Sequence, residues 1–252
     1  EKQMLKIIAK GGSDFEPGTK AAYSNSNYVL LSYILEKIYK MPYGRILNVK
    51  IVKPLGLKET LVGSKIASEN NESYSYELKD EKWVLQPETD MSIPLGAGAL
   101  VSTPSDLSVF IYALFNGKLI SAESVKKMQT LAGGYGLGLV QVPFYEQIGY
   151  GHGGGIDGFR SFLVYYPEDK VAVAYTSNGS NYDNNNVTIA LLSSVYNKAY
   201  EIPDFTSIDK DLDQYPGVYS STGFPLKITI TKSGNGLVAQ ATGQPSFPLK
   251  AG

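Results

Sequence analysis

Residues 149–159 form a glycine-rich stretch that holds the only histidine of the chain, His152. Six of these residues are glycine, and apolar runs lie on both sides. Glycine weakens a strand because it adds no side chain to the packing, so a glycine cluster in a strand pattern is typical of a bulge or of a ligand close to the backbone. Two interpretations stay open: a glycine-rich hairpin loop with an incidental histidine, or a strand that leaves room for a ligand.

A second motif, Tyr23-Ser24-Asn25, lies far upstream. Apolar residues recur at helical spacing over residues 30–38, which predicts a helix, and Asn25 or Ser26 would cap its first turn. Tyr23 and Asn25 would then lie on the loop that enters this helix, where a rigid scaffold can present polar side chains to a cleft. On their own, the two residues are better explained as a packed tyrosine and a helix cap.

The rest of the first 200 residues combines helices with an antiparallel sheet. Thr103, Pro104 and Asp106 form a strong helix start, as cap, first and third helical position. Short turns join the apolar runs after residue 135, which predicts an antiparallel meander. We expect an α/β (α+β) fold in which this sheet is flanked by the last helix and by a mostly helical region of residues 20–130. The predicted helices cover residues 43–52, 107–115, 121–129 and 185–200, and the predicted strands cover residues 136–142, 160–166 and 170–176.

The chain changes character near residue 202. Residues 202–205 have the composition of a linker, and the short β runs beyond them flank an Asn-Gly pair at residues 235–236, which is a hairpin signal. An isolated hairpin is only marginally stable. We therefore expect one domain over residues 1–202 and, over residues 203–252, a linker and the start of a small β domain that is cut short.

The composition excludes several functions. The chain has 23 basic and 24 acidic residues and no basic run, so we expect no nucleic-acid partner. It has no cysteine, which removes disulfides, thiol catalysis and zinc–thiolate sites. A single histidine argues against a histidine-rich catalytic metal site, so we expect no metal and no cofactor. No apolar run is long enough to span a bilayer, and no signal peptide is visible.

Several motifs follow one another in an informative order: Phe-Glu-Pro-Gly at residues 15–18, Tyr23-Ser24-Asn25, the small residues that lead into a helix over 96–106, and His152-Gly153-Gly154. In this order they resemble the serine penicillin-recognising hydrolases. The most similar branch is that of the class C β-lactamases, D-alanyl-D-alanine peptidases and esterases. The resemblance covers most of residues 1–200 and implies a β-lactamase/transpeptidase-like fold.

The family uses three motifs, of which two are matched here. Ser-x-x-Lys supplies the acylated serine and its lysine partner. Tyr23 and Asn25 match the Tyr-x-Asn motif, and His152 and Gly154 match the Lys/His-x-Gly motif. By this resemblance, Tyr23 relays a proton between the serine and the leaving group. Asn25 contacts the amide of the substrate acyl group and helps to orient the lysine.

The resemblance also implies roles for His152 and for the glycines that follow it. His152 would face Tyr23 across the cleft, where its protonated form could attract a substrate carboxylate, and a histidine changes its charge between about pH 5 and 8. Gly153, Gly154 and Gly155 would let the substrate lie against the strand edge. The N–H of Gly155 would be one oxyanion donor and the serine N–H the other, and removing such a donor commonly costs about a hundredfold or more in rate.

The Ser-x-x-Lys motif should precede Tyr23, but residues 1–22 do not contain it. Two matches occur elsewhere, at Ser124 and Ser207. We reject both because they stand in the wrong order and a pattern with two fixed positions often arises by chance. We therefore expect the chain to lack the amino-terminal segment of the family and to be inactive alone. The missing segment would act as a separate piece, or the chain would assemble with another copy.

These observations predict a serine hydrolase that works through an acyl-enzyme on a small-molecule or peptide substrate: a β-lactam, a D-alanyl peptide or an ester. The family usually works in the periplasm or as a secreted protein. One alternative is a non-catalytic, penicillin-binding-like module that binds peptides or cell-wall fragments. A second alternative is an α/β-hydrolase with a His-Gly-Gly-Gly oxyanion hole. It is disfavoured because the chain has no Gly-x-Ser-x-Gly sequence.

Overall fold

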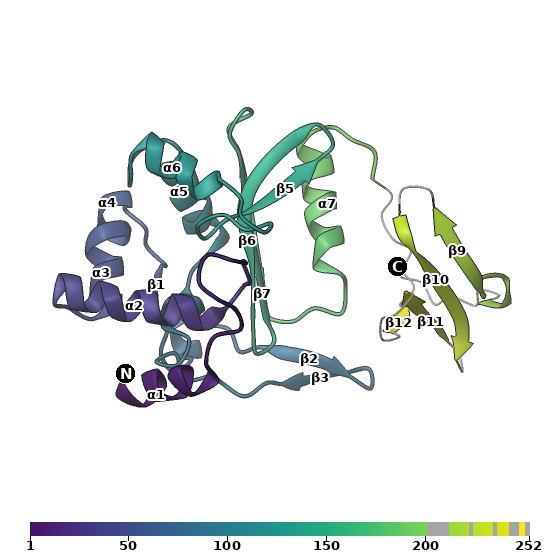
Figure 1. The fold of residues 1–252 in the computed structure, drawn as a ribbon, viewed down its shortest axis with the longest axis horizontal. Coiled ribbons are helices and arrows are strands. Elements are labelled where there is room, and N and C mark those ends of the chain that lie inside the picture. Colours follow the sequence, from purple (N-terminus) through teal and green to yellow (C-terminus); the bar gives the residue numbers. More distant parts are fainter. Residues whose placement is uncertain (201–211, 222–223, 234–235, 242–246, 250–252) are drawn as a thin grey trace. The chain divides into compact units, whose positions relative to one another are not determined.

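The structure, a computed structural model, divides the chain into two units, Glu1–Ala199 and Tyr200–Gly252. Each unit is described by itself. The described residues are 1–200, 212–221, 224–233, 236–241 and 247–249 (Figure 1).

The centre of the first unit is an antiparallel sheet of four strands in the order β5-β6-β7-β8 (Figure 1). The strands are β5 (Val140–Phe144), β6 (Gln147–Ile156), β7 (Phe159–Tyr166) and β8 (Val171–Ser177). The predicted meander is confirmed, but β5 begins at Val140 rather than at residue 136. The reason is local: the Gly136 N–H donates to the Leu139 carbonyl oxygen at 2.8 Å, and Gly138 has a φ of 76°, so these residues turn.

One face of the sheet packs against helix α7 (Asn184–Val195). Adjacent strand residues point to opposite faces, and the side chains on this face form a cluster with α7: Phe144, Val164, Tyr166, Val173 and Leu192. Helix α7 ends at Val195, before the predicted residue 200, where the Tyr196 N–H donates to the Leu192 carbonyl oxygen at 2.8 Å. Burial raises the pKa of Tyr166 to about 12.

The opposite face packs against helix α5 (Pro104–Phe115). Tyr165 lies on this face because its neighbours Val164 and Tyr166 face α7. The Tyr165 ring contacts Phe115 of α5 at a centroid distance of 5.0 Å. The sheet therefore lies between two helices, as the α/β (α+β) prediction requires.

The remaining elements of the first unit are short or mostly helical. Helix α2 (Asn25–Tyr39) starts one residue after its cap, Ser24, so the prediction that Asn25 or Ser26 is the cap is wrong. The predicted helix over 43–52 is confirmed as a helical run that continues to Leu55. The other elements are α1 (Lys2–Gly11), α3 (Tyr43–Leu47), η1 (Asn48–Val52), α4 (Lys53–Leu55), β1 (Leu61–Val62), η2 (Ser68–Asn70), β2 (Tyr76–Lys79), β3 (Lys82–Leu85), η3 (Leu95–Ala97), β4 (Leu100–Val101) and α6 (Ala122–Gln129).

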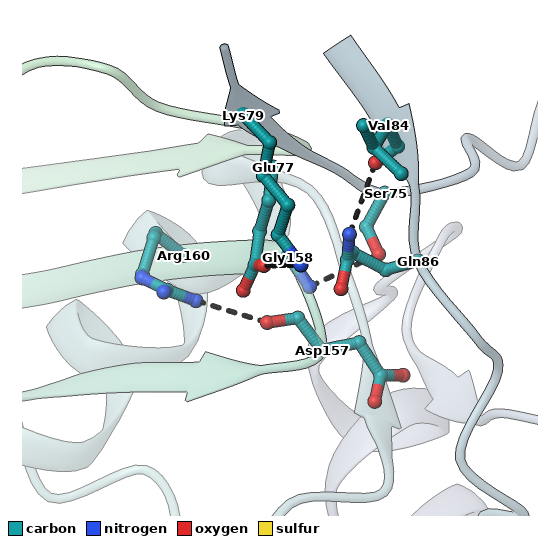
Figure 2. A network of polar contacts seen from close by, with 8 residues as sticks. All are labelled: Ser75, Glu77, Lys79, Val84, Gln86, Asp157, Gly158 and Arg160. Carbon is teal, nitrogen blue, oxygen red and sulfur yellow. Dashed lines mark hydrogen bonds and ion pairs between the residues drawn. The ribbon is translucent and has the colours of Figure 1, made fainter.

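The turn between β6 and β7 is fixed by polar contacts with the segments on both sides of the β2–β3 hairpin. The Gly158 N–H donates to Ser75 Oγ at 3.1 Å, a contact that Figure 2 shows beside the hairpin. The Asp157 carboxylate accepts hydrogen bonds from Thr89 N (3.1 Å) and Thr89 Oγ1 (2.7 Å). Arg160 Nη1 donates to the carbonyl oxygen of Asp157 at 3.3 Å (Figure 2). The contacts of this turn with Ser75 and Thr89 therefore hold the carboxyl end of β6 in place.

The second unit is an antiparallel sheet in the order β12-β11-β10-β9. The predicted hairpin corresponds to β10 and β11, but most of its turn and the predicted linker at 202–205 lie outside the described residues. The elements are η4 (Leu212–Gln214), β9 (Gly217–Ser221), β10 (Phe224–Ser233), β11 (Gly236–Ala241) and β12 (Phe247–Leu249). Across the described part of both units, no helix is both long and apolar enough to cross a membrane.

A buried carboxylate anchors the start of α5. Asp106 is the third helical residue and is only 9% exposed. Burial alone would raise its pKa. Hydrogen bonds from Glu59 N (2.8 Å), Thr60 Oγ1 (2.8 Å) and Lys58 N (3.1 Å) outweigh burial, so the net pKa is lowered. Asp106 therefore ties the loop after α4 to the first turn of α5.

We expect Asp106→Asn to reduce the free energy of unfolding at neutral pH by about 2 kcal/mol, because hydrogen bonds to a charged acceptor are lost. A lowered pKa in the folded state gives stability that is present above the ordinary value of 3.8 and is lost as the pH falls through the folded-state value. The difference from the wild type should therefore shrink in acid. Urea unfolding at neutral and acidic pH measures this. The control is Asp90→Asn at an exposed turn, and an equal loss there would contradict the assignment.

Candidate active site

Tyr23 and Asn25 lie together at the amino terminus of α2. The Tyr23 hydroxyl donates to Asn25 Oδ1 at 3.0 Å. Asn25 is the first residue of the helix, and the cap Ser24 makes no side-chain hydrogen bond to the helix. The Asn25 side chain therefore orients the Tyr23 phenol and does not cap the helix. The interpretation of Asn25 as a simple helix cap is wrong.

His152 of β6 lies against Tyr23. Their rings are stacked, with centroids 5.9 Å apart and an interplanar angle of 29°. The structure thus brings together the three residues that sequence analysis selected from two distant motifs. Tyr23 remains 48% exposed, so its side chain is partly open to solvent beside the pocket.

The His152 ring has a defined hydrogen-bond partner. Nδ1 lies 2.5 Å from the carbonyl oxygen of Gly153. A carbonyl oxygen can only accept, so Nδ1 carries the proton and the neutral ring keeps Nε2 as an acceptor. The short contact therefore selects one tautomer of His152.

Over the residues that the structure describes, strand β6 has a partner strand on both edges only at Tyr150 and Gly151. Its pairing with β5 ends at Gly151, opposite Val140, whereas its pairing with β7 continues to Ile156. Among the described residues, no strand pairs with the outer edge of residues 152–156. We call this half-strand edge the open edge. An unpaired edge presents backbone N–H and C=O groups to an extended ligand.

The ladder geometry shows which groups face outwards. In an antiparallel pair, residues that exchange both backbone hydrogen bonds alternate with residues that exchange none. The two-residue turn at 157–158 closes on Ile156 and Phe159, a hydrogen-bonded pair in a hairpin of this kind. By alternation, Gly153 and Gly155 direct their N–H and C=O groups to the open edge. This agrees with the contact from His152 to the Gly153 carbonyl oxygen.

Packing does not account for all glycines of the stretch. A Cβ on Gly151 would lie 1.9 Å from the carbonyl oxygen of Leu163, so glycine is required there. A Cβ on Gly153 or Gly155 would meet its nearest atom at 3.7 Å or 3.5 Å, which is ordinary contact. At Gly154 the nearest atom is the end of a serine side chain, 2.5 Å away. Close packing inside the protein therefore does not require glycine at Gly153 or Gly155.

A pocket of about 140 Å³ adjoins Tyr23 and His152. Tyr135, which sequence analysis missed, lies in its wall and contacts the Tyr23 ring at a centroid distance of 5.7 Å. The only sequence signal was its position in a second glycine cluster, residues 133–136. The other lining residues are Ala21, Ala22, Ser24, Asn27, Tyr28, Gly136, Gly138 and Leu139.

The arrangement brings a phenol, an imidazole and an open backbone edge together. Among the described residues, the serine that lines the pocket is Ser24, which is not part of a Ser-x-x-Lys sequence. Ser124 of the rejected match lies in α6 and contacts Ser121 Oγ at 3.0 Å. Its lysine partner by spacing, Lys127, forms an ion pair with Glu123 at 2.9 Å. Ser207 lies outside the described residues. Within the described part of the chain, no group of three or more histidine, cysteine or acidic residues could hold a metal ion.

The model of the Beta-lactamase family matches residues 1–194. Among curated proteins, the chain is 30% identical over 185 residues to penicillin-binding protein 4* of Bacillus subtilis, a match that covers 65% of this chain and 41% of that protein. The chain therefore spans less than half of the length of this relative.

Solved structures agree with this match. A D-stereospecific amidohydrolase from a Streptomyces species has a TM-score of 0.70 at 28% identity, covering 79% of this chain and 61% of that one. An octameric penicillin-binding protein homologue from Pyrococcus abyssi has a TM-score of 0.68 at 26% identity, covering 97% of this chain and 59% of that one. These similarities confirm the fold that the sequence motifs predicted.

The tautomer of His152 can be measured directly, because this is the only histidine of the chain. We expect two-bond ¹H–¹⁵N correlation spectra of the neutral ring to show the proton on Nδ1. The urea-unfolded chain provides the reference spectrum. A native spectrum with the proton on Nε2 would mean that the Gly153 carbonyl oxygen does not accept from this ring.

Two glycine substitutions distinguish packing from ligand access. Gly151→Ala should reduce the free energy of unfolding by about 2 kcal/mol or more, because its Cβ collides with backbone. Gly153→Ala should change it by less than about 1 kcal/mol, and in the stabilising direction if the backbone does not move. Thermal and urea unfolding of both variants test this pair, and equal losses would refute the distinction.

Proposed function

Because the chain belongs to the beta-lactamase family, we propose that it forms one wall of the active site of a serine hydrolase. The substrate would contain an amide or β-lactam bond, and the reaction would pass through an acyl-enzyme. One observation carries the proposal: the stacked rings of Tyr23 and His152 lie where the open edge of β6 begins. This juxtaposition combines a proton-transfer group with a backbone edge that can bind an acyl chain.

Each group has a role in the proposed reaction. The serine Oγ would bond to the substrate carbonyl carbon as its proton passes to Tyr23 Oη, and the proton would then go to the leaving nitrogen as the C–N bond breaks. Tyr23 donates to Asn25 in the resting site. To act as a base, it must first give up this proton to a neighbouring base, such as the lysine of a Ser-x-x-Lys segment. Water would then hydrolyse the ester by the reverse path.

The open edge would bind and polarise the substrate. The N–H of Gly155 points outwards by strand alternation and would donate to the developing oxyanion. The amide of Asn25, whose Oδ1 already accepts from Tyr23, would keep Nδ2 for the substrate carbonyl oxygen. His152 would face the leaving-group side, with Nε2 accepting when the ring is neutral and donating when it is protonated.

The substrate class follows from the relatives named above. Penicillin-binding proteins and a D-stereospecific amidohydrolase share this fold, so we favour an amide next to a D-amino acid or a β-lactam over a simple ester. The Ser-x-x-Lys nucleophile would come from a segment outside residues 1–252. We place the whole protein outside the cytoplasm, where cell-wall peptides occur.

The intact mass before and after incubation with a penicillin tests the proposal. We expect no adduct on residues 1–252 alone and one penicillin-sized adduct in the longer protein, or on a co-purifying piece, that carries Ser-x-x-Lys. In that complete protein, Tyr23→Phe should slow acylation by about a hundredfold or more, as the loss of a general base commonly does. Tyr39→Phe, at the far end of the helix that follows Tyr23, is the matched control.

Other outcomes point elsewhere. An adduct on residues 1–252 would mean that a serine such as Ser124 is the nucleophile. Binding of penicillin by the complete protein without an adduct would favour the non-catalytic binding module. Equal acylation by the wild type and by Tyr23→Phe would remove Tyr23 from the mechanism.

A further inference from the structure

Tyr135 supports the ring of Tyr23. The two rings have centroids 5.7 Å apart and an interplanar angle of 33°, within the range of favourable aromatic contacts. His152 makes the other ring contact of Tyr23. Tyr23 is 48% exposed, and these two rings and the hydrogen bond to Asn25 hold its ring on the surface.

The loop that carries Tyr135 is fixed on both sides. A pair of backbone hydrogen bonds joins Ala132 and Tyr135, at 2.8 and 3.2 Å. The turn between them includes Gly133, with a φ of 59°, and a Cβ on Gly133 would lie 2.8 Å from the Cβ of Ala21. Such a close approach is possible only for glycine. The turn is therefore seated against the segment that leads directly into Tyr23.

The other side of the loop is bound to α6. The Leu137 N–H donates to the Met128 carbonyl oxygen at 3.0 Å. A Cβ on Gly136 would lie 2.1 Å from the same oxygen, so this position also requires glycine. The residues on both sides of Tyr135 thus pack closely against other segments, which leaves the loop little freedom.

We propose that Tyr135 is a positioning residue, whose ring holds Tyr23 in the orientation that directs its hydroxyl to Asn25 and its face to His152. This inference rests on the proposed function for its catalytic meaning, because Tyr23 would be the proton-transfer group. The claim that the Tyr135 ring holds the Tyr23 ring in place does not depend on catalytic turnover. Removing the Tyr135 ring leaves the Tyr23 side chain free to rotate into the adjoining pocket, so its hydroxyl no longer stays beside Asn25.

The single histidine makes the orientation of Tyr23 observable. The ring current of Tyr23 displaces the proton resonances of His152, and Tyr23→Leu gives the reference without that ring. We expect Tyr135→Ala to move the His152 resonances towards the Tyr23→Leu values while the melting temperature stays close to that of the wild type. Tyr135→Phe should keep the wild-type resonances, because the phenyl ring makes the same contact. Tyr39→Ala, which removes an exposed tyrosine at the carboxyl end of α2, should leave them unchanged.

A folded Tyr135→Ala protein with wild-type His152 resonances would overturn the proposal. So would a Tyr135→Phe protein that behaves like Tyr135→Ala, since the effect would then not depend on the ring. If Tyr135→Ala does not fold, Tyr135→Leu provides apolar volume without an aromatic ring and must show the same displacement. None of these measurements needs catalysis, so a chain that is never acylated by penicillin could still confirm or exclude this role.

Discussion

The site depends on an unequal pairing of one strand. β6 pairs with β5 from Gln147 to Gly151 and with β7 from Tyr150 to Ile156, so within the described part of the chain only Tyr150 and Gly151 have a strand on both sides. Beyond Gly151 the edge that faces away from β7 is therefore open, while β7 pairs with the other edge as far as Ile156. The contacts of Asp157 and Gly158 with Thr89 and Ser75 then fix its far end. A histidine at the first open position can therefore face the loop before α2, with its Nδ1 bonded to the carbonyl oxygen of Gly153.

Local signals predicted much of this arrangement. Thr103 accepts from the Asp106 N–H as its position before Pro104 indicated, and Ser121 accepts from the Ser124 N–H in the same way. The antiparallel meander followed from short turns between apolar runs. The pairing of the Tyr-x-Asn motif with the histidine strand was inferred from the resemblance to a known family, and the ring contact between Tyr23 and His152 agrees with it.

The rest depended on contacts that no local pattern contains. Asn25 did not become a helix cap because its oxygen is used by the Tyr23 hydroxyl. β5 begins later than the sequence predicted because the Gly136 N–H donates to the Leu139 carbonyl oxygen and not to a neighbouring strand. Tyr135 escaped notice because its role depends on the approach of Gly133 to Ala21, which are distant in the sequence. Two carboxylates, Asp106 and Asp157, hold separate loops of the first unit by accepting from backbone N–H groups, whereas the ion pairs among the described residues are exposed and contribute little.

The outer strand on the other side of the sheet has a consequence for the isolated chain. β8 is hydrogen-bonded to β7 alone among the described residues, and its sequence from Val171 to Ser177 contains no charged residue and no proline. Natural edge strands usually carry such residues as protection against pairing with other chains. We therefore expect the free chain to self-associate at high concentration by sheet extension at β8, which sedimentation over a concentration series would detect.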